Sequence, residues 1–249
     1  MIPDKELIVK ELAERGLYPA VTVFDETDST NTRARELLKE NSKTELLVLA
    51  ASQTVGKGSH GRSFYSPRDT GLYFTASYSG LDYGMPVTFA AAVASAKALK
   101  RLGADTVIKW VNDIFSDGKK AGGILCERTG SGSVIIGVGI NLEEPEEGFP
   151  EEISGTATSL STGRNIRDEL AVELYSELTR AVRTDPASVM DEYRSMCGTV
   201  GRRIRFDWED SVREGTACGI DDDGSLLVRE DSGEVLRLLS GNVSVRYAD

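Results

Sequence analysis

The segment from Gly56 to Arg62 carries residues that could bind a phosphate group. Its sequence is Gly-Lys-Gly-Ser-His-Gly-Arg, and it follows the apolar, strand-like run from Leu46 to Ala51. Glycine adopts positive φ freely and has no Cβ, so backbone N–H groups and the two cationic side chains can close around an anion. The pattern therefore predicts a phosphate-binding loop.

The same glycines also match a dinucleotide-binding fingerprint. Gly56, Gly58 and Gly61 fit G-x-G-x-x-G, but that fingerprint requires a helix that opens at the third glycine. The residues that follow include Pro67 and Gly71, which are typical of turns. We therefore favour a loop between two strands over a Rossmann turn.

Composition limits the remaining chemistry. The 249 residues carry a net charge of −11, which opposes a nucleic-acid partner bound by bulk electrostatics. The single histidine, His60, excludes a histidine metal cluster, and a Ser-His-Asp triad would have to use it. Lysine, arginine, carboxylate and amide groups remain, and these suit phosphate and acyl-phosphate chemistry.

Cysteine usage and hydropathy indicate a cytoplasmic protein. Cys126, Cys197 and Cys218 are widely separated and odd in number, so neither a disulfide framework nor a thiolate zinc site is indicated. The N-terminus is charged where a signal peptide needs an apolar core, and no segment is long and apolar enough to span a bilayer. We therefore expect no membrane partner.

Hydrophobic periodicity predicts an α+β fold, a mixed sheet flanked by helices. Helices are expected at 4–15, 32–40, 86–102 and 167–182, and strands at 21–24, 46–51, 72–77, 107–110, 123–127 and 134–141. After residue 198 the chain changes to short strands and tight turns, which is typical of a small antiparallel barrel. We expect a catalytic domain at 1–195 and a second domain at 196–249.

Five motifs occur in a fixed order along the chain. They are Asp28-Ser29-Thr30-Asn31, the glycine loop, Lys109-Trp110-Val111-Asn112-Asp113, Lys120 to Leu125, and Gly137-Val138-Gly139-Ile140-Asn141. Together they resemble biotin protein ligases over nearly the whole chain. The resemblance implies a class II aminoacyl-tRNA synthetase-like catalytic domain followed by an SH3-like domain. It also implies the short type, without an N-terminal DNA-binding domain.

The resemblance implies a reaction in two steps. Biotin and MgATP give biotinyl-5'-AMP and pyrophosphate, and a lysine of a biotin carboxyl carrier domain of a carboxylase then takes the biotinyl group. The implied small molecules are therefore biotin, ATP and Mg²⁺. Whether the chain forms a homodimer stays open at this point.

Motif positions carry over three catalytic residues. Lys120 matches the principal lysine that stabilises charge on the α-phosphate, Lys57 matches a second cation at the activated carboxylate, and Asp113 would orient or deprotonate the attacking amine. Simpler interpretations stay open. Lys120 could be a solvated lysine beside Lys119, and Asp113 could cap a turn.

The binding residues implied by the same motifs form two sets. For biotin they are Ser29, Thr30, Gln53, Lys57, Tyr73, Lys120 and Gly137, and Phe64 would wall the pocket or its lid. For ATP they are Gly56, Lys57, Gly58, Arg62, Trp110, Asn112 and Asn141. Magnesium would lie near Asn112 and Asn141 without a carboxylate cage, since it accepts amides, phosphates and water as ligands. A helix cap for Ser29 and core packing for Tyr73 are the competing interpretations.

Two positions depart from the family pattern. Ser59 stands where an arginine is usual, and we expect its lack of charge to weaken retention of the adenylate. Val111 replaces a proline and removes no reacting group. The alternative functions are a lipoate-type acyl-adenylating ligase, a biotin-binding regulator without transferase activity, and, least favoured, a nucleic-acid-binding module.

Overall fold

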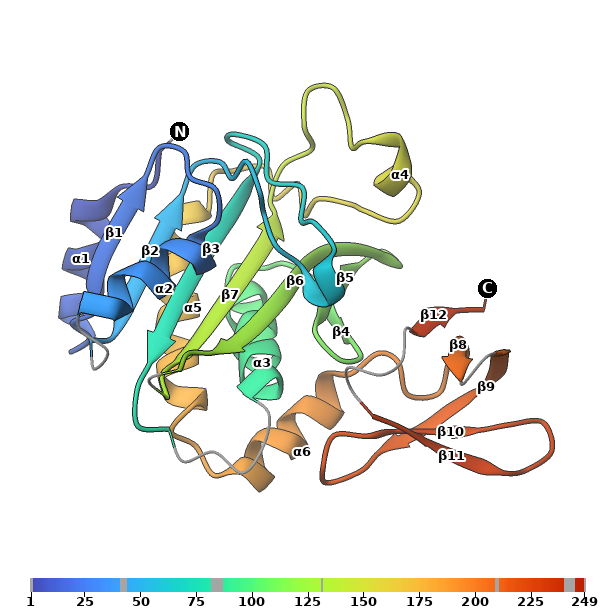
Figure 1. Ribbon diagram of the computed structural model, residues 1–249. Helices are drawn as coiled ribbons and strands as arrows, with labels where there is room; N and C mark the ends of the chain where they lie inside the picture. Colours follow the sequence, from blue (N-terminus) through green and yellow to red (C-terminus); the bar gives the residue numbers. More distant parts are fainter. Residues whose placement is uncertain are drawn as a thin grey trace.

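The computed structural model describes residues 2–40, 44–81, 87–130, 132–208, 211–239 and 245–248. They form two sheets with helices packed around the larger one (Figure 1). The larger sheet and its helices come from the first four-fifths of the chain, and the smaller sheet follows it. The predicted α+β class with a mixed sheet is confirmed.

The elements alternate along the first part of the chain. The helices are α1 (Lys5–Glu14), α2 (Thr30–Glu40), α3 (Val87–Arg101), α4 (Glu151–Ser154), α5 (Arg167–Ala181) and α6 (Pro186–Met196), with a short 3-10 helix η1 (Ser59–Gly61). The strands are β1 (Ala20–Phe24), β2 (Leu46–Ala50), β3 (Gly71–Tyr78), β4 (Val107–Lys109), β5 (Asp113–Ser116), β6 (Lys119–Arg128) and β7 (Val134–Asn141).

The larger sheet has the order β1-β2-β3-β7-β6-β5-β4. Strands β1 and β2 pair in parallel, and every other neighbouring pair is antiparallel. The central strand β3 is buried along its whole length and β7 along most of its length, because both faces of the sheet are covered. A rigid sheet of this kind can position side chains from several strands at one place.

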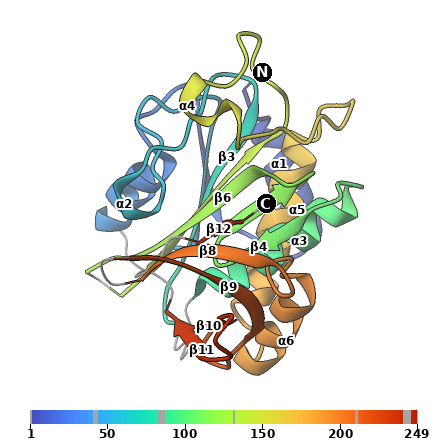
Figure 2. The ribbon, with the colours of Figure 1, turned by 90° about the vertical axis from the view of Figure 1, so that its right-hand side faces the viewer.

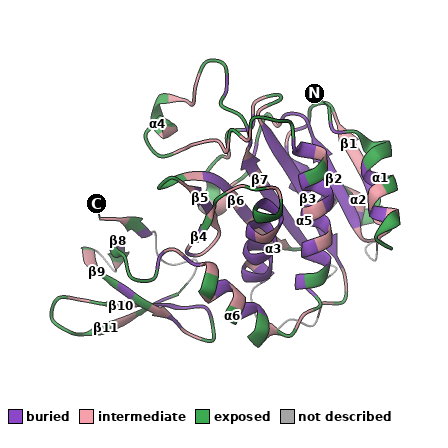
Figure 3. Ribbon diagram, turned by 180° about the vertical axis from the view of Figure 1, so that it is seen from behind, coloured by how far each residue is buried: buried purple, intermediate pink, exposed green. Residues whose placement is uncertain are grey.

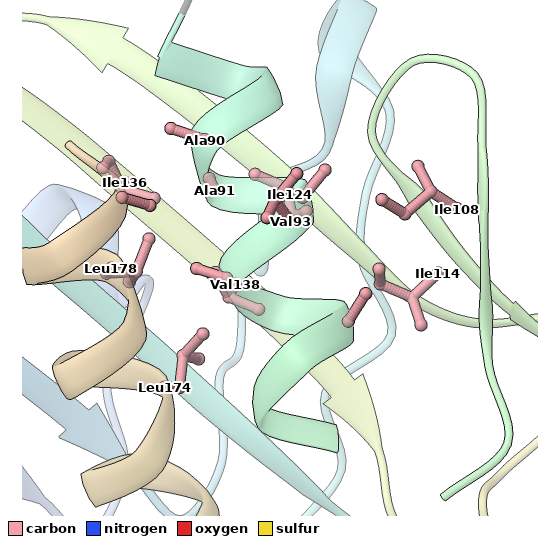
Figure 4. Close-up of a cluster of buried hydrophobic side chains, with 14 of the residues drawn as sticks. Ala90, Ala91, Val93, Ile108, Ile114, Ile124, Ile136, Val138, Leu174 and Leu178 are labelled. Atoms are coloured by element: carbon pink, nitrogen blue, oxygen red, sulfur yellow. The ribbon is translucent and has the colours of Figure 1, made fainter. Parts of the chain in front are cut away.

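Helices cover the two faces of this sheet unequally. Helix α2 packs Ala34 and Leu38 on Leu46, Val48 and Ile135 at one face. Helices α1, α3 and α5 cover the opposite face, where the main core lies (Figure 3). Figure 4 shows how the small alanine side chains of α3 let this helix approach the buried isoleucine and valine side chains of the strands. The face that carries α2 is therefore the more open one.

The smaller sheet is antiparallel and has the order β11-β10-β9-β8-β12. Its strands are β8 (Arg203–Trp208), β9 (Ser211–Ile220), β10 (Leu226–Arg229), β11 (Val235–Leu238) and β12 (Val245–Tyr247). It lies beside β4 and α6 (Figure 2), where the indole Nε1 of Trp110 donates to the carbonyl oxygen of Gly224 at 3.0 Å. The strands were predicted, whereas closure of an SH3-like barrel stays a prediction.

Some elements differ from the sequence-based expectations. Strand β5, which begins at Asp113, and helices α4 and α6 had not been expected. The predicted start of the third helix at Pro86 lies outside the described residues. Within the described residues, no helix combines the length and hydropathy that crossing a membrane requires.

Gly224, between β9 and β10, offers a direct test of how the smaller sheet packs against helix α3. Its φ is +84°, and a Cβ at this position would overlap the ring of Phe89 on α3. We expect Gly224→Ala to lower the free energy of unfolding by about 3 kcal/mol or more, because left-handed strain and overpacking add. Urea titration measures this change.

Gly233 provides the matched control. Its φ is +91°, but nothing lies within 4 Å of the position that an alanine methyl group would take. Gly233→Ala should therefore cost only the conformational penalty of about 1 to 2 kcal/mol. Equal losses for the two variants would contradict the close packing of Gly224 against α3.

Candidate active site

Two cavities meet on the face of the larger sheet that carries α2. The first runs between the start of α2, the glycine loop and strands β6 and β7. Its lining residues are Ser29, Thr30, Asn31, Gln53, Lys57, Gly58, Ser59, Phe64, Phe74, Asn112, Lys120, Gly123, Ile124, Leu125, Gly137, Val138 and Gly139. Each of the five motifs thus contributes to this one cavity.

The second cavity lies on the other side of the glycine loop, against the segment that contains α4. Its lining residues are Gly58, Ser59, Arg62, Ser63, Phe64, Tyr65, Lys120, Asn141, Phe149, Ile153, Thr156 and Ala157. Four residues line both cavities, namely Gly58, Ser59, Phe64 and Lys120. A molecule in one cavity and a molecule in the other would therefore meet beside Lys120.

Lys120 is held at this junction by an ion pair. Its Nζ lies 2.6 Å from Oδ1 of Asp113, and the lysine side chain keeps 36% of its surface exposed. A register shift in the β5–β6 pairing places Lys120 opposite Phe115 and Gly123 opposite Asp113. Because of this bulge, Lys120 and Asp113 project from the same face of the sheet.

The glycine loop folds back on itself between β2 and β3. The amide of Gly58 donates to the carbonyl oxygen of Arg62 at 2.7 Å, and the amide of Phe64 donates to that of Gly56 at 2.9 Å. A Cβ on Gly56 would overlap the carbonyl oxygen of Phe64. The three-residue helix η1 is the only helical turn here, so the loop is not a Rossmann turn.

Two cationic side chains of the loop are placed differently. Nζ of Lys57 donates to Oγ1 of Thr32 on α2 at 2.9 Å, which directs the lysine into the first cavity. The guanidinium of Arg62 donates through Nε to the carbonyl oxygen of Ser59 at 3.3 Å, beside the second cavity. The side chain of His60 lies outside the described part of the chain.

The start of α2 and Gln53 form a polar end to the first cavity. Oε1 of Gln53 accepts from the amide of Thr30 at 2.8 Å and lies 3.1 Å from its Oγ1. Nε2 of Gln53 donates to Oγ of Ser66 at 2.9 Å. Ser29 is 1% exposed, and its amide donates to the Asp28 carboxylate at 2.7 Å. These neutral groups suit a ligand that carries both donors and acceptors.

Asp28 stabilises the loop at the polar end of the first cavity. Burial opposes its charge, but hydrogen bonds from the Ser29 amide and the Thr27 hydroxyl, together with the nearby Arg33 guanidinium, leave the pKa of Asp28 below its usual value. The carboxylate therefore stays ionised and keeps the loop before α2 in place.

Four predicted site residues, Gly56, Tyr73, Trp110 and Asp113, line neither cavity, although Asp113 contacts Lys120 at their junction. Tyr73 is 1% exposed, its hydroxyl donates to the carbonyl oxygen of Pro67 at 2.7 Å, and burial raises its pKa to about 12. Trp110 is 5% exposed and faces the smaller sheet through its bond to Gly224. Gly56 shapes the loop by close packing without reaching a cavity wall.

The two asparagines are each tied through the amide nitrogen. Nδ2 of Asn112 donates to the carbonyl oxygen of Ile124 at 2.6 Å, and Nδ2 of Asn141 donates to that of Thr158 at 3.0 Å. Their amide oxygens remain as the atoms that can meet a cation. Asn112 lines the first cavity and Asn141 the second, so the structure does not place them on one wall.

Sequence analysis missed the apolar residues of the second cavity. Phe149, Ile153 and Ala157 come from the segment around α4, which pairs with β6 through bonds between Lys120 and residues Thr156 and Thr158. The only sequence signal is an isolated phenylalanine in an acidic, turn-rich stretch, and that pattern alone does not indicate a binding wall. Asn31, Thr75 and Glu127 were also missed as a linked polar cluster.

Comparison with known proteins agrees with this geometry. Residues 23–141 match the biotin/lipoate A/B protein ligase family, and residues 199–246 match the biotin protein ligase C-terminal domain. The bifunctional ligase/repressor BirA of Bacillus spizizenii is 30% identical over 238 residues, which cover 89% of this chain and 72% of the relative. A biotin–[acetyl-CoA-carboxylase] ligase of Mycobacterium tuberculosis is 28% identical, with 96% and 98% of the two chains covered.

Solved structures share the fold. A biotin protein ligase from Aquifex aeolicus in complex with biotin and ATP superimposes with a TM-score of 0.79 at 24% identity, covering 93% of this chain and 100% of that one. A biotin protein ligase from Leishmania major in complex with biotinyl-5-AMP superimposes with a TM-score of 0.63 at 25% identity, covering 89% and 99%. The order of motifs, the paired cavities and these matches lead to one conclusion: the chain belongs to the biotin/lipoate A/B protein ligase family.

Proposed function

We propose that this chain is an ATP-dependent biotin protein ligase that makes biotinyl-5'-AMP and transfers biotin to a lysine of a biotin carboxyl carrier domain. The single observation that carries the proposal is Lys120 at the junction of the two cavities. A match to the biotin protein ligase C-terminal domain and relatives named as biotin ligases favour biotin over lipoate.

The first cavity suits biotin. Ser29, Thr30 and Gln53 offer neutral polar atoms for the ureido ring at one end, and Gly137 removes side-chain bulk from the adjacent strand. Lys57 and Lys120 line the same cavity and supply the positive charges that the biotin carboxylate would meet. In this proposal Tyr73 supports the wall from behind and does not touch the ligand.

The second cavity suits the nucleotide. Arg62 and the backbone of the glycine loop would face the phosphates, and the apolar side chains of Phe149 and Ile153 would cover the base. Gly56 and Trp110 then contribute indirectly, by shaping the loop and by anchoring the turn before Asn112.

Adenylation requires a carboxylate to approach a triphosphate. The carboxylate oxygen attacks the α-phosphorus, the bond to the β-phosphate oxygen breaks, and pyrophosphate leaves with that electron pair. Lys120 would reduce the repulsion between the two anions and stabilise charge in the transition state. Lys57 would hold the second carboxylate oxygen.

Transfer forms an amide bond and releases AMP. The carrier lysine attacks the carbonyl carbon of the mixed anhydride, and the bond from this carbon to the phosphate oxygen breaks. The amine must lose a proton, and Asp113 would accept or orient it because its carboxylate lies at the junction beside Lys120.

Magnesium would neutralise phosphate charge during the first step. The amide oxygens of Asn112 and Asn141 suit this ion chemically, since both amide nitrogens are engaged by backbone carbonyl groups, and each would meet it from its own cavity. Oxygen ligands and retained water satisfy magnesium without a carboxylate cage.

The proposal also covers organisation and location. Residues 1–195 would form the catalytic domain and 196–249 an SH3-like domain, in line with the two separate sheets. The free thiols of Cys126, Cys197 and Cys218 favour a reducing cytoplasm. The net charge of −11 favours no nucleic-acid partner.

Lys120 gives the most direct test. We expect Lys120→Gln to lower kcat for biotin-dependent pyrophosphate release about 10²- to 10³-fold, because a charge-stabilising donor is lost. Mass spectrometry of a carrier domain incubated with biotin and MgATP should show a matching loss of biotinylation. Lys119→Gln, at the exposed neighbouring position, should keep normal rates.

Two results would oppose this assignment. Normal turnover of Lys120→Gln would exclude the proposed role for its ammonium. Modification of the carrier by lipoate in preference to biotin would instead favour the lipoate-type ligase, and biotin binding without pyrophosphate release would favour a regulator.

Ser59 gives a second prediction. It lines both cavities without charge, so we expect the wild-type chain to release adenylate and to biotinylate lysines of a bystander protein that lacks a carrier domain. Ser59→Arg should reduce this diffuse labelling, measured by mass spectrometry, while carrier labelling continues.

Val55→Arg is the matched control for the added charge. Val55 lies on the same loop, is 60% exposed and lines neither cavity. It should leave bystander labelling unchanged. Absence of bystander labelling by the wild-type chain would show that the adenylate is retained despite Ser59.

A further inference from the structure

A polar cluster extends from the wall of the first cavity into the protein, and the part of it beyond Thr30 has no role in the proposed reaction. It consists of Thr30 and Asn31 at the start of α2, Thr75 on β3, and Glu127 on β6. Thr30 and Asn31 are each 4% exposed and Thr75 is fully buried, whereas the Glu127 side chain is 27% exposed. Buried polar groups of this kind must satisfy one another, so their donors and acceptors can be assigned.

The amide of Asn31 has one permitted orientation. On one side it faces Oε2 of Glu127 at 2.8 Å and the carbonyl oxygen of Leu125 at 3.4 Å. The carbonyl oxygen can only accept a hydrogen bond, and so can the carboxylate oxygen when Glu127 is ionised, so the NH2 group must face them. Oδ1 of Asn31 therefore faces Oγ1 of Thr75 at 2.7 Å and needs a donor there.

Thr75 must supply that hydrogen. A hydroxyl group has a single hydrogen, and Thr75 lies within reach of both Asn31 and Thr30, the latter at 2.8 Å. Once this hydrogen points to Asn31, it points away from Thr30. The hydrogen of Thr30 in turn goes to Thr75 or to Oε1 of Gln53 at 3.1 Å. The lone pairs of Thr30 then remain for a ligand.

Glu127 keeps its charge in this setting. Burial opposes ionisation, but the hydrogen bonds from Asn31 and Arg35 and the positive charges of Arg35 and Lys57 outweigh it, so the pKa of Glu127 lies below its usual value. The Arg35 guanidinium donates to Oε1 of Glu127 at 2.8 Å, while Oε2 faces Asn31. Each carboxylate oxygen thus has its own partner.

We propose that Glu127 is a positioning residue that, through Asn31 and Thr75, makes the Thr30 hydroxyl a hydrogen-bond acceptor for a ring N–H of the substrate. The proposal rests on the proposed function, since it assigns the N–H to the ureido ring of biotin. Glu127 never touches the ligand. Its effect travels through two hydrogen bonds and determines which substrate atoms the cavity accepts.

Replacing the carboxylate by an amide removes the shorter of the two contacts that orient Asn31, the one at 2.8 Å, and leaves only the long contact of 3.4 Å to the Leu125 carbonyl oxygen. The side chain in Glu127→Gln can offer its own NH2 group to Asn31, so the Asn31 amide is free to turn its NH2 group toward Thr75. Thr75 then directs its hydrogen to Thr30, where it competes with the substrate N–H for the same oxygen. A ligand that has no N–H at this place loses little by the change.

Isothermal titration with biotin and with its two cyclic carbamate analogues, each with one ring N–H replaced by oxygen, tests this. The wild-type chain should bind the analogue that lacks the N–H facing Thr30 about tenfold more weakly than biotin. Glu127→Gln should weaken biotin about tenfold and that analogue hardly at all, so the discrimination disappears. Glu36→Gln, an exposed carboxylate on α2 paired with Arg33, is the charge-matched control and should behave as wild type.

A second pair of variants separates this effect from misfolding. Thr75→Ser keeps the hydroxyl and should behave as wild type. Thr75→Val leaves no hydrogen to compete for the Thr30 oxygen, so the double variant Glu127→Gln/Thr75→Val should recover the discrimination that Glu127→Gln alone loses, with thermal unfolding recorded for each variant. Equal loss of biotin and analogue in Glu127→Gln would indicate a merely structural residue and overturn the proposal, as would unchanged discrimination. Failure of the wild-type chain to bind biotin would instead overturn the proposed function.

Discussion

The site depends on one positive charge that the sheet holds between two cavities. If the pairing of Asp113 with Gly123 continued without interruption, Lys120 would lie on the other face of the sheet, and the bulge between β5 and β6 brings both charged side chains to one face. The resulting ion pair of 2.6 Å keeps the ammonium beside the glycine loop while leaving part of it exposed. Because Lys120 is carried by a strand, its ammonium is in position before an anion binds. A lysine on a flexible loop would not be held in this way.

Glycines on β7 set the depth of the same site. A Cβ on Gly137 would overlap the Asn31 amide, and a Cβ on Gly139 would lie 2.5 Å from the ring of Phe64. The absence of side chains thus lets α2 and the loop approach the strand from the same face. The Gly137–Asn31 contact also holds the amide that links Glu127 to Thr75, so the cavity wall and the polar cluster share one packing constraint.

Sequence patterns predicted what is encoded locally. Ser29, Lys57 and Lys120 reach the first cavity because their motifs lie at the ends of strands or at a helix start, which a mixed sheet brings together. The direction in which a buried side chain points could not be predicted from the sequence patterns. Tyr73 and Trp110 were expected at the ligand, but their polar atoms are bonded elsewhere when buried: Tyr73 to the carbonyl oxygen of Pro67, and Trp110 to that of Gly224, which is 114 residues away in the sequence. Phe149 was missed because a single aromatic residue forms no hydrophobic periodicity from which a buried face could be predicted.

The smaller sheet contributes to the site without entering it. Among the described residues, none beyond residue 198 lines either cavity. The amide of Trp110 nonetheless donates to Oγ1 of Thr199 at 2.9 Å, its indole bonds Gly224, and the Tyr193 hydroxyl donates to the carbonyl oxygen of Val111 at 3.0 Å. The turn before Asn112 and Asp113 is therefore fixed from outside the larger sheet. Because Asp113 holds Lys120, the packing that orders this turn also bears on where the charge lies.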